Sequence, residues 1–313
     1  MRIIRFSAFI IVLTLIFSML AACGGDNKAP DVTGADAEST EAPASESESI
    51  TEEITVLPVD PMLAEIVQHM KDDPNYLIFV IGDSLTEGQG ASDPERLDYT
   101  AKFAEKIAER IPEKNVYRID GKRNNDATAI IYPNKGKHVP VQRVSGTTDE
   151  IVVARCGIGG NTVKRIIDRS YDFVGKELRG QTGDLFIIMS GINDSSAGNS
   201  AKYASPPAYK KNLNTLLDMI YAEHPEADVI LMTPTYSGND GRTLDMYAKQ
   251  MKDVGKEREI PVIDMHELWM NHWIKGAENY GQGDWLKDGD SCHPTDIGHE
   301  AIADYMVKCL FGY

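Results

Sequence analysis

Cysteine is scarce in this sequence, with four among 313 residues. No two cysteines form a CxxC pair, and no group of cysteine and histidine has the spacing of a zinc site. We therefore predict that the protein binds no metal.

Positive charge is also in short supply. The chain has 32 lysine and arginine residues against 48 aspartate and glutamate residues, which gives a formal net charge of −16 at pH 7. A nucleic-acid-binding protein must neutralise phosphates, so we expect no nucleic-acid partner. Such a surface also does not favour electrostatic attraction to anionic lipid.

Long apolar runs are lacking except at residues 6–20, which follow the basic residues Arg2 and Arg5. This length suits the apolar segment of a signal peptide and is short for a membrane-spanning helix, which needs roughly 20 residues. Residues 20–23 (LAAC) resemble the bacterial lipobox, which implies cleavage before Cys23 and lipidation of its thiol. We expect residues 1–22 to be a lipoprotein signal peptide; an uncleaved anchor is the alternative.

The segment after Cys23 is rich in Ser, Thr, Ala, Asp and Glu and poor in large apolar residues. Such a segment buries too little apolar surface to offset its ordering entropy. We predict that residues 23–55 hold the lipidated cysteine and a disordered acidic tether. The protein would then lie at the cell surface, anchored by lipid to the bacterial membrane. Three other cysteines remain, which is no disulfide framework.

Residues 56–313 are expected to form one domain of alternating strands and helices. Strand–helix alternation predicts an α/β fold with a parallel central sheet and helices on both sides. Continuous apolar runs, typical of strands buried on both faces, occur at residues 77–81, 151–154, 185–189, 229–232 and 260–263. Apolar residues recur with helical spacing at residues 163–174, 213–221 and 297–309.

Residues 120–149 interrupt this alternation with polar sequence and turn signals at 133–134 (PN) and 145–146 (SG). We expect loops and a short hairpin there. In an open α/β fold such an excursion can wall the ligand site. A surface loop without a role is the alternative.

Ser84 stands in residues 82–86 (GDSLT), directly after the first predicted strand. A serine on such a turn has its hydroxyl exposed at the end of the sheet, where a nucleophile is needed. The motif differs from the G-x-S-x-G elbow of α/β-hydrolases, because position 86 is threonine. Taken alone, the segment is also compatible with a plain turn.

Residues 156–162 (CGIGGNT) form a glycine-rich turn before a predicted helix. Asn161 or Thr162 can cap that helix and leave backbone amides pointing into the site. Such amides suit the oxyanion of an acyl-transfer intermediate. A dinucleotide site would need G-x-G-x-x-G followed by an acid about 20 residues on, which is missing here.

Asn193 belongs to residues 191–194 (GIND), at the end of the strand predicted at 185–189. Its side-chain amide could add one more oxyanion donor. A strand-ending turn is the alternative, since Gly, Asn and Asp all favour turns.

His293 lies in residues 290–294 (DSCHP), before the last predicted helix, where Pro294 suits the first helical position. Asp290 can turn back to the ring, and a carboxylate on one ring nitrogen leaves the other ready to take a proton. A histidine before a helix can also be structural. None of the six other histidines, however, has an acid three residues before it and a proline after it, and we interpret His299 as structural.

The four segments, in this order along residues 77–310, resemble the conserved blocks of the SGNH hydrolases, also called the GDSL family. The resemblance implies a flavodoxin-like three-layer α/β/α sandwich. It also implies two-step ester hydrolysis through an acyl-enzyme, with no cofactor. Ser84 would be the nucleophile and His293 the general base, oriented by Asp290.

The same resemblance implies an oxyanion hole made of the Ser84 amide, the Gly160 amide and the Asn193 side chain. Asp83 and Asp194, which flank these motifs, would have supporting roles.

One departure from the family pattern is Arg155-Cys156, where many relatives have an asparagine before the glycine-rich turn. Cys156 and Cys292 lie beside the oxyanion turn and the histidine loop, and a disulfide between them is one hypothesis. The other is that both are small core residues with free thiols.

A tethered surface enzyme meets extracellular glycans, so we expect removal of acetyl or other small acyl groups from carbohydrate. Trp285 could stack on a sugar, or could simply be a core or surface residue. The alternatives are a lipase or lysophospholipase, and a non-catalytic surface binding lipoprotein. The sequence does not fix the oligomeric state.

Overall fold

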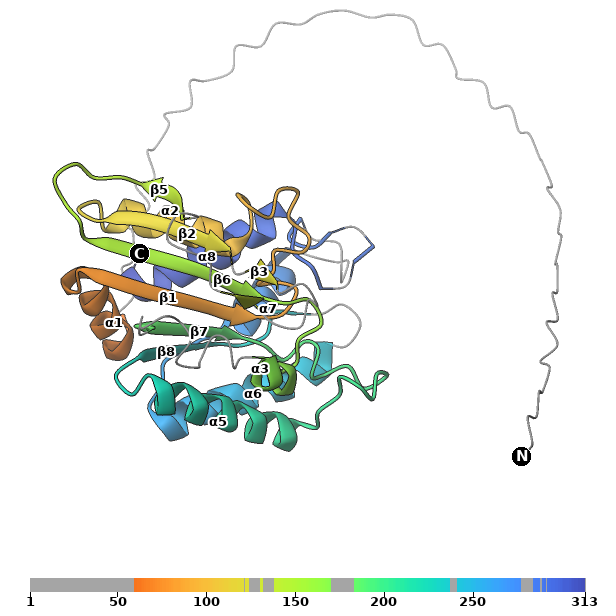
Figure 1. Cartoon of the computed structure of the whole chain (residues 1–313). Helices are drawn as coiled ribbons and strands as arrows, with labels where there is room; N and C mark the ends of the chain where they lie inside the picture. The colour runs from red at the N-terminus through yellow and green to blue at the C-terminus, as the bar shows by residue number, and fades with distance from the viewer. Residues whose placement is uncertain are drawn as a thin grey trace, which may run out of the picture. The chain divides into compact units, whose positions relative to one another are not determined.

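The computed structural model describes residues 59–120, 122–123, 130–131, 138–169, 183–236, 241–276, 284–287, 289–290 and 292–312 (Figure 1). The predicted signal peptide, the lipidation site at Cys23 and the tether lie outside these residues. In the part that is described, no helix has the length and apolar character needed to cross a membrane.

Seven strands form the main sheet, and all neighbours pair in parallel except the edge strand β5, which runs antiparallel to β2. Strands β3 (Lys122–Arg123) and β4 (Ile130–Ile131) form a separate antiparallel pair. In sheet order, the seven strands are β5 (Val139–Gln142), β2 (Asn115–Asp120), β6 (Glu150–Gly157), β1 (Asn75–Gly82), β7 (Leu185–Met189), β8 (Asp228–Met232) and β9 (Val262–Ile263).

Helices connect the strands and begin at identifiable capping residues. Asp60 accepts a hydrogen bond from the Met62 amide at the start of the first helix, and Asp98 does the same for two amides of the second. The described helices are α1 (Pro61–Asp72), α2 (Tyr99–Arg110), α3 (Val163–Arg169), α5 (Pro206–Glu223), α6 (Gly241–Arg258), α7 (Met265–Gly276) and α8 (Asp296–Phe311).

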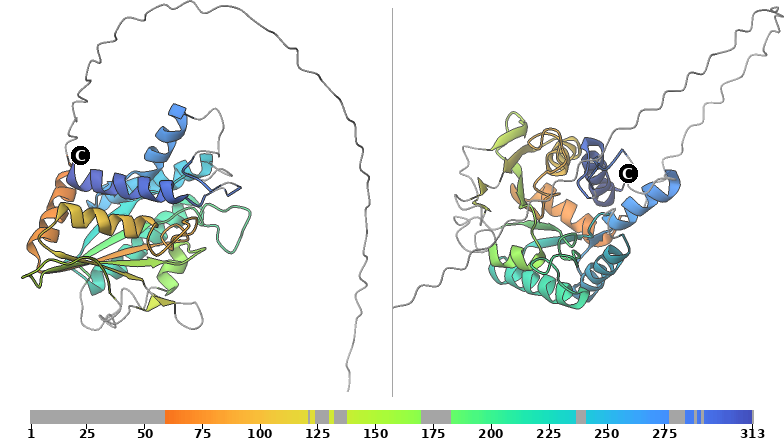
Figure 2. Two further views of the ribbon diagram at one scale, coloured as in Figure 1. Left: turned by 90° about the horizontal axis from the view of Figure 1, so that it is seen from above. Right: turned by 90° about the vertical axis from the view of Figure 1, so that its right-hand side faces the viewer.

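The helices cover both faces of the sheet and create two apolar cores (Figure 2). Ile78 and Val80 of β1 pack in a core with α1, α2, α7 and α8. Leu77, Phe79 and Ile81 pack in the other core with α3, α5 and α6. Because β1 is buried on both sides, its sequence is a continuous apolar run rather than an alternating one.

The predicted three-layer α/β fold is confirmed, and the five predicted strands correspond to β1, β6, β7, β8 and β9. In the region 120–149, the described residues form the β3–β4 pair and β5, while residues 124–129 and 132–137 lie outside the description. Whether this region walls a ligand site stays a prediction.

The order of the strands positions the candidate site. Strand β1 is central, with β6 on one side and β7 on the other. The connection after β1 runs toward β2, and the connection after β7 runs in the opposite direction, toward β8. In open α/β sheets, ligands bind at the carboxyl ends of the strands at such a switch point. The turns that follow β1, β6 and β7 carry Ser84, Gly160 and Asn193.

Candidate active site

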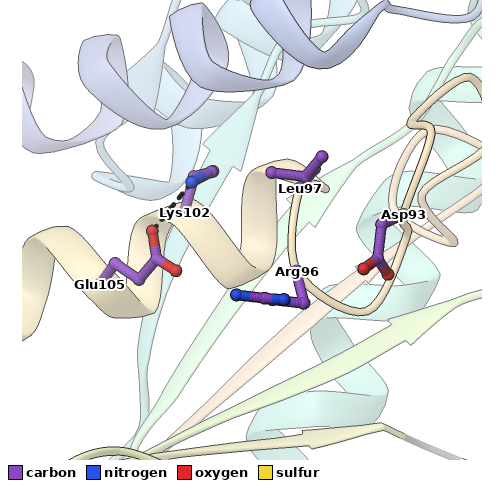
Figure 3. A pocket seen from close by; sticks show the side chains of 5 residues that line it. All are labelled: Asp93, Arg96, Leu97, Lys102 and Glu105. Atoms are coloured by element: carbon purple, nitrogen blue, oxygen red, sulfur yellow. Dashed lines mark hydrogen bonds and ion pairs between the residues drawn. The ribbon is translucent and has the colours of Figure 1, made fainter.

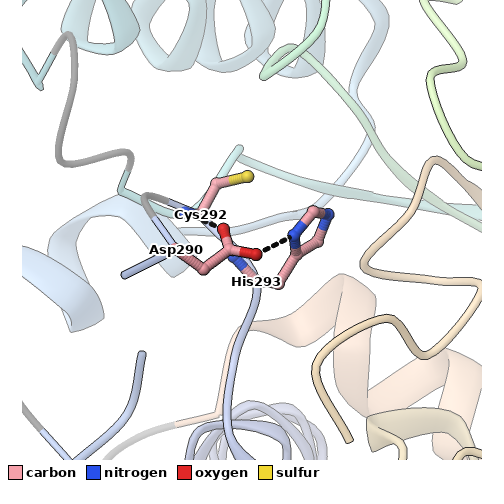
Figure 4. A group of neighbouring side chains, drawn as sticks. All are labelled: Asp290, Cys292 and His293. Carbon is pink, nitrogen blue, oxygen red and sulfur yellow. Dashed lines mark hydrogen bonds and ion pairs between the residues drawn. The ribbon is translucent and has the colours of Figure 1, made fainter. Parts of the chain in front are cut away.

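Ser84, His293 and Asp290 form a continuous chain of hydrogen bonds. His293 Nε2 lies 2.9 Å from Ser84 Oγ, although the two residues are 209 positions apart in the sequence. On the other side of the ring, His293 Nδ1 lies 2.6 Å from Asp290 Oδ2 (Figure 4). In this arrangement, a carboxylate holds one ring nitrogen while the other faces a hydroxyl.

Asp290 is held as a carboxylate by its own loop. Partial burial acts to raise its pKa, but hydrogen bonds from the Cys292 amide, the His293 ring and the His293 amide lower the pKa of Asp290 to about 2. The acid is therefore ionised near neutral pH and can fix the tautomer of the imidazole.

The last helix begins later than predicted. Its first residue is Asp296 and its N-cap is Thr295, whose hydroxyl accepts from the Gly298 amide. Pro294 instead forms an isolated β-bridge with Leu286, so the expectation that it is the first helical residue is wrong. The bridge and the Thr295 cap place His293 outside the helix, on a loop fixed at both sides.

The nucleophile turn is packed closely against the glycine-rich turn. Asp83 is buried and accepts a hydrogen bond from the Leu85 amide at 3.0 Å, which tightens the turn around Ser84. A Cβ at Gly157 would lie 2.2 Å from the Glu87 amide nitrogen, so only glycine permits this approach of the two turns. Ser84 itself is buried, with 7% of its surface exposed, whereas the sequence predicted an exposed serine.

The histidine loop also depends on a close approach. At Gly90, where φ is 97°, a Cβ would lie 2.1 Å from the Pro294 carbonyl oxygen and 3.1 Å from the Cβ of His293. This glycine brings the loop after Ser84 against the loop that carries His293. No local motif marks Gly90 in the sequence, because its importance depends on a contact between distant segments.

Two of the predicted oxyanion donors, the Gly160 amide and the Asn193 side chain, belong to segments that lie close to one another. Gly160 adopts a positive φ of 75°, and Lys202 lies beside it and also donates to Asn193. Asn193 Nδ2 points toward the buried Asp83 Oδ2 at 3.4 Å. The motifs after β1, β6 and β7 are thus brought together.

The start of helix α3 differs in one respect from the expectation. Thr162 does cap the helix, since its hydroxyl accepts from the Arg165 amide at 3.1 Å. The Val163 amide, however, donates to both carboxylate oxygens of Asp194 at 3.2 Å. Asp194 therefore binds an amide that was expected to point into the site, and it joins the turn after β7 to α3.

Burial dominates the protonation of the two aspartates beside the motifs. It raises the pKa of Asp83 to about 6, although the hydrogen bonds from the Leu85 amide and the Asn193 side chain oppose this shift. It raises the pKa of Asp194 to about 7, against the hydrogen bond from Val163. The pKa values of both acids are therefore shifted toward neutral pH.

Arg155 replaces the asparagine expected before the glycine-rich turn, and it anchors the neighbouring loop. Its Nη1 donates to the Glu87 carbonyl, to the Pro94 carbonyl and to the buried Asp98 carboxylate at 2.7 Å. Its Nε pairs with Asp120 at 2.9 Å. Arg155 therefore ties residues 87–98 to the carboxyl ends of β2 and β6.

The hypothesis of a disulfide between Cys156 and Cys292 is wrong, because Cys156 is a buried, unbridged thiol. Burial strongly raises its pKa, so it behaves as a small apolar side chain.

Asp290, Cys292 and His293 together offer three ligand atoms within 4.8 Å of one another, a spacing compatible with a metal ion (Figure 4). Both ring nitrogens of His293 already contact Asp290 and Ser84. The absence of a bound metal stays a prediction.

A surface pocket of about 300 Å³ lies beside the start of α2 (Figure 3). The Lys102–Glu105 ion pair forms part of its lining, together with Asp93, Arg96 and Leu97. It contains none of the three hydrogen-bonded residues Ser84, His293 and Asp290. Its lining carries charges of both signs, which do not select a ligand.

The chain matches a family model and several solved structures. Residues 131–301 match the model of the GDSL-like Lipase/Acylhydrolase family. No match was found among curated proteins.

Several solved structures share the fold. An acetyl xylan esterase named AlAXEase is 17% identical, with a TM-score of 0.53, over 75% of this chain and 100% of that chain. An acetylxylan esterase from Geobacillus stearothermophilus is 22% identical, with a TM-score of 0.53, over 75% of this chain and 94% of that one. A two-domain esterase active on acetylated mannans is 18% identical, with a TM-score of 0.53, over 82% of this chain and 54% of that one.

Proposed function

We propose that this protein removes acetyl or other small acyl groups from extracellular carbohydrate. The premise is that the chain belongs to the GDSL-like lipase/acylhydrolase family and is a carboxylic ester hydrolase. The hydrogen-bonded chain Ser84–His293–Asp290 is the observation that carries the hydrolytic part of the proposal. The carbohydrate part is supported by the structural neighbours, which are described as esterases of acetylated xylan and mannan.

In the proposed first step, His293 Nε2 takes the proton of Ser84 while Oγ attacks the ester carbonyl. The carbonyl oxygen becomes an oxyanion that accepts from the Ser84 amide, the Gly160 amide and Asn193 Nδ2. The tetrahedral intermediate then collapses. The alcohol leaves with the proton from His293, and the acyl group remains on Ser84.

In the second step, water replaces the alcohol and completes the cycle. His293 takes a proton from water, and the resulting hydroxide attacks the acyl-enzyme. The second tetrahedral intermediate releases the carboxylic acid, and the proton returns to Ser84. Asp290, whose pKa is lowered to about 2, stays ionised throughout and holds His293 Nδ1 through the hydrogen bond of 2.6 Å.

Trp285 is a less suitable sugar platform than the sequence suggests. The ring of His272 stacks on it at 3.6 Å with an interplanar angle of 2°, and Trp269 meets it edge-on at 5.0 Å. One face of the indole is therefore covered. We assign the recognition of sugar to no single aromatic residue.

The proposal also includes a lipid anchor at Cys23. It is supported by the lipobox-like residues 20–23 after the apolar run at 6–20. An anchored enzyme on an acidic tether would act on glycans outside the cell. A short acyl group is favoured for a separate reason, since the sequence has no long apolar segment beside the site motifs.

The hydrolysis of nitrophenyl acetate by wild type and by Ser84→Ala tests the enzymatic part. We expect turnover to fall by about 10⁴- to 10⁶-fold in the variant, because the nucleophile is lost. Ser205→Ala is the matched control, since Ser205 is an exposed serine whose side chain makes no capping hydrogen bond. Equal activity of Ser84→Ala and wild type would contradict the proposal.

Acyl chain length and alcohol then test the substrate. We expect nitrophenyl acetate to be cleaved faster than the butyrate and much faster than the palmitate, and acetate to be released from acetylated xylan or mannan. Preference for the palmitate would support the lipase alternative instead. Binding of glycan without any ester cleavage would support a non-catalytic surface protein.

A further inference from the structure

Lys202 contacts the side chain that is proposed to donate to the oxyanion. It lies on the segment between β7 and α5, and its Nζ donates to Asn193 Oδ1 at 3.0 Å. The same ammonium group borders the glycine-rich turn, since a Cβ at Gly160 would lie 3.4 Å from Nζ. Lys202 is therefore adjacent to two of the three proposed oxyanion donors.

The two neighbours of Asn193 allow only one orientation of its amide group. An ammonium group can only donate, so it selects the carbonyl oxygen, and the Asp83 carboxylate on the other side accepts from Nδ2 at 3.4 Å. A flipped amide would turn its NH2 group toward the Lys202 ammonium, which is unfavourable, and would turn its oxygen toward Asp83, which is unfavourable whenever that acid is ionised. Because Nδ2 carries two hydrogens, one remains for the oxyanion.

The backbone around Lys202 is fixed by several hydrogen bonds. The Lys202 amide donates to the Asn199 carbonyl at 2.9 Å, and the Ala204 amide donates to the Asp194 carbonyl at 2.9 Å. The Tyr247 hydroxyl, which is buried, also donates to the Ala204 carbonyl. The half-buried lysine is thus presented from a structured turn rather than from a free surface segment.

We propose that Lys202 is a positioning residue of the oxyanion hole, which fixes the orientation of the Asn193 amide and polarises its Nδ2–H bond. An ionised donor on the carbonyl oxygen strengthens the hydrogen bond that the same amide donates, since hydrogen bonds in series polarise one another. The inference rests on the proposed acyl transfer at Ser84. It does not depend on which alcohol or glycan is the substrate.

Kinetics of Lys202→Met on nitrophenyl acetate test this inference. Loss of a complete oxyanion donor costs roughly 10²- to 10³-fold in kcat, so loss of a residue that acts through the donor is expected to cost about tenfold to a hundredfold. The fall should be in kcat and not in KM, because the oxyanion exists only in the transition state and intermediates. Lys202→Arg, which keeps a charged donor, should recover most of kcat.

Two controls separate positioning from a general effect of charge or folding. Lys211→Met removes an exposed lysine from α5 and should leave kcat and the melting temperature unchanged. In an Asn193→Ala background, Lys202→Met should cause almost no further loss, because the residue through which it acts is gone. Arg165, which donates to the Gly160 carbonyl, is present in all these variants.

Three results would overturn the inference. One is an unchanged kcat in Lys202→Met. Another is a full additive loss in the Asn193→Ala background. A third is a loss of kcat/KM on nitrophenyl acetate that comes wholly from a rise in KM, which would make Lys202 a substrate contact rather than a positioning residue.

If wild type hydrolyses no ester, the proposed function fails, and the inference is tested by the Asn193 side-chain amide signal of protein labelled with ¹⁵N-asparagine. That signal should shift in Lys202→Met and not in Lys211→Met. An unshifted signal would overturn the inference independently of activity.

Discussion

Asp83 is a buried carboxylic acid directly beside the proposed nucleophile, and its protonation should appear in the stability of the protein. Burial raises its pKa from 3.8 to about 6 in the folded state. The folded state therefore binds more protons than the unfolded chain between these pH values, so this contribution to stability is present at low pH and lost as the pH rises through 6.

We expect Asp83→Asn to become more stable relative to wild type as the pH rises from about 4 to about 7, because asparagine does not titrate. Its Oδ1 can still accept from the Leu85 amide, so the turn is kept. Urea unfolding at pH 4, 5, 6 and 7 measures the difference. A difference in unfolding free energy that does not change with pH would show that Asp83 is not the titrating group.

The pKa of Asp290 is shifted in the opposite direction to that of Asp83, because the hydrogen bonds that Asp290 accepts keep it ionised. Asp290→Asn can retain the bonds that Oδ1 accepts from the Cys292 and His293 amides, but it no longer fixes the ring tautomer. We expect kcat on nitrophenyl acetate to fall by about 10³- to 10⁴-fold. The control is Asp284→Asn, which removes the acid from the His272–Asp284 pair and should leave kcat unchanged. Activity of Asp290→Asn within tenfold of wild type would exclude an orienting role.

At the level of single residues, a contact can be predicted from sequence when both partners lie in one short motif. Asp290 and His293 are three positions apart on one turn, so their contact could be predicted from local chemistry. The contact between Lys202 and Asn193 could not be predicted in this way. It depends on how a loop without a periodic pattern folds back after β7, and only tertiary structure determines that path.

Among the elements, the loop at residues 87–98 depends on one buried carboxylate. Asp98 is fully buried, and its Oδ2 accepts from Arg118 at 2.8 Å and from Arg155 at 2.7 Å. Its Oδ1 caps α2 through the Thr100 amide. A single side chain thus joins the loop, the helix and the carboxyl ends of β2 and β6.

We expect Asp98→Asn to lower the unfolding free energy by about 3–5 kcal/mol, because two largely buried guanidinium groups lose their buried counter-ion and keep only the more exposed Asp120. The matched control is Asp218→Asn, which breaks an exposed pair with Arg258 and should cost about 0–1 kcal/mol. Urea denaturation of the two variants and of wild type measures both changes. Equal losses in the two variants would mean that the buried network does not stabilise the loop.

This network also explains why some elements could not be predicted from sequence. Strand β2 has the sequence NVYRID, whose polar residues hide the apolar pattern of a buried strand. Arg118 is acceptable inside it because Asp98 and Asp120 neutralise the charge. Similarly, Pro294 suits a helix start by its own chemistry, but the tertiary bridge to Leu286 moves that start to Asp296.

On the scale of the whole molecule, strand order converts distant motifs into one site. The uninterrupted apolar runs sufficed to predict a parallel sheet covered on both faces, since only such strands are apolar throughout. They do not give the order β5-β2-β6-β1-β7-β8-β9, which depends on where each crossover returns to the sheet. That order is what places the turns after β1, β6 and β7 side by side.

All residues of the proposed site lie in the compact unit Glu53–Tyr313, which has consequences for the predicted anchor. If lipidation at Cys23 only attaches the protein to the membrane, loss of the lipid should change the location of the protein and leave its catalytic activity intact.

We expect wild type expressed in a bacterial host to incorporate an alkyne-labelled fatty acid and to need detergent for release from membranes, since more than one acyl chain gives stable anchoring. Cys23→Ser should incorporate no label but keep its kcat on nitrophenyl acetate, whereas Cys309→Ser should be labelled like wild type. Labelling that persists in Cys23→Ser would place the lipid elsewhere and would remove the basis for a surface tether that begins at this cysteine.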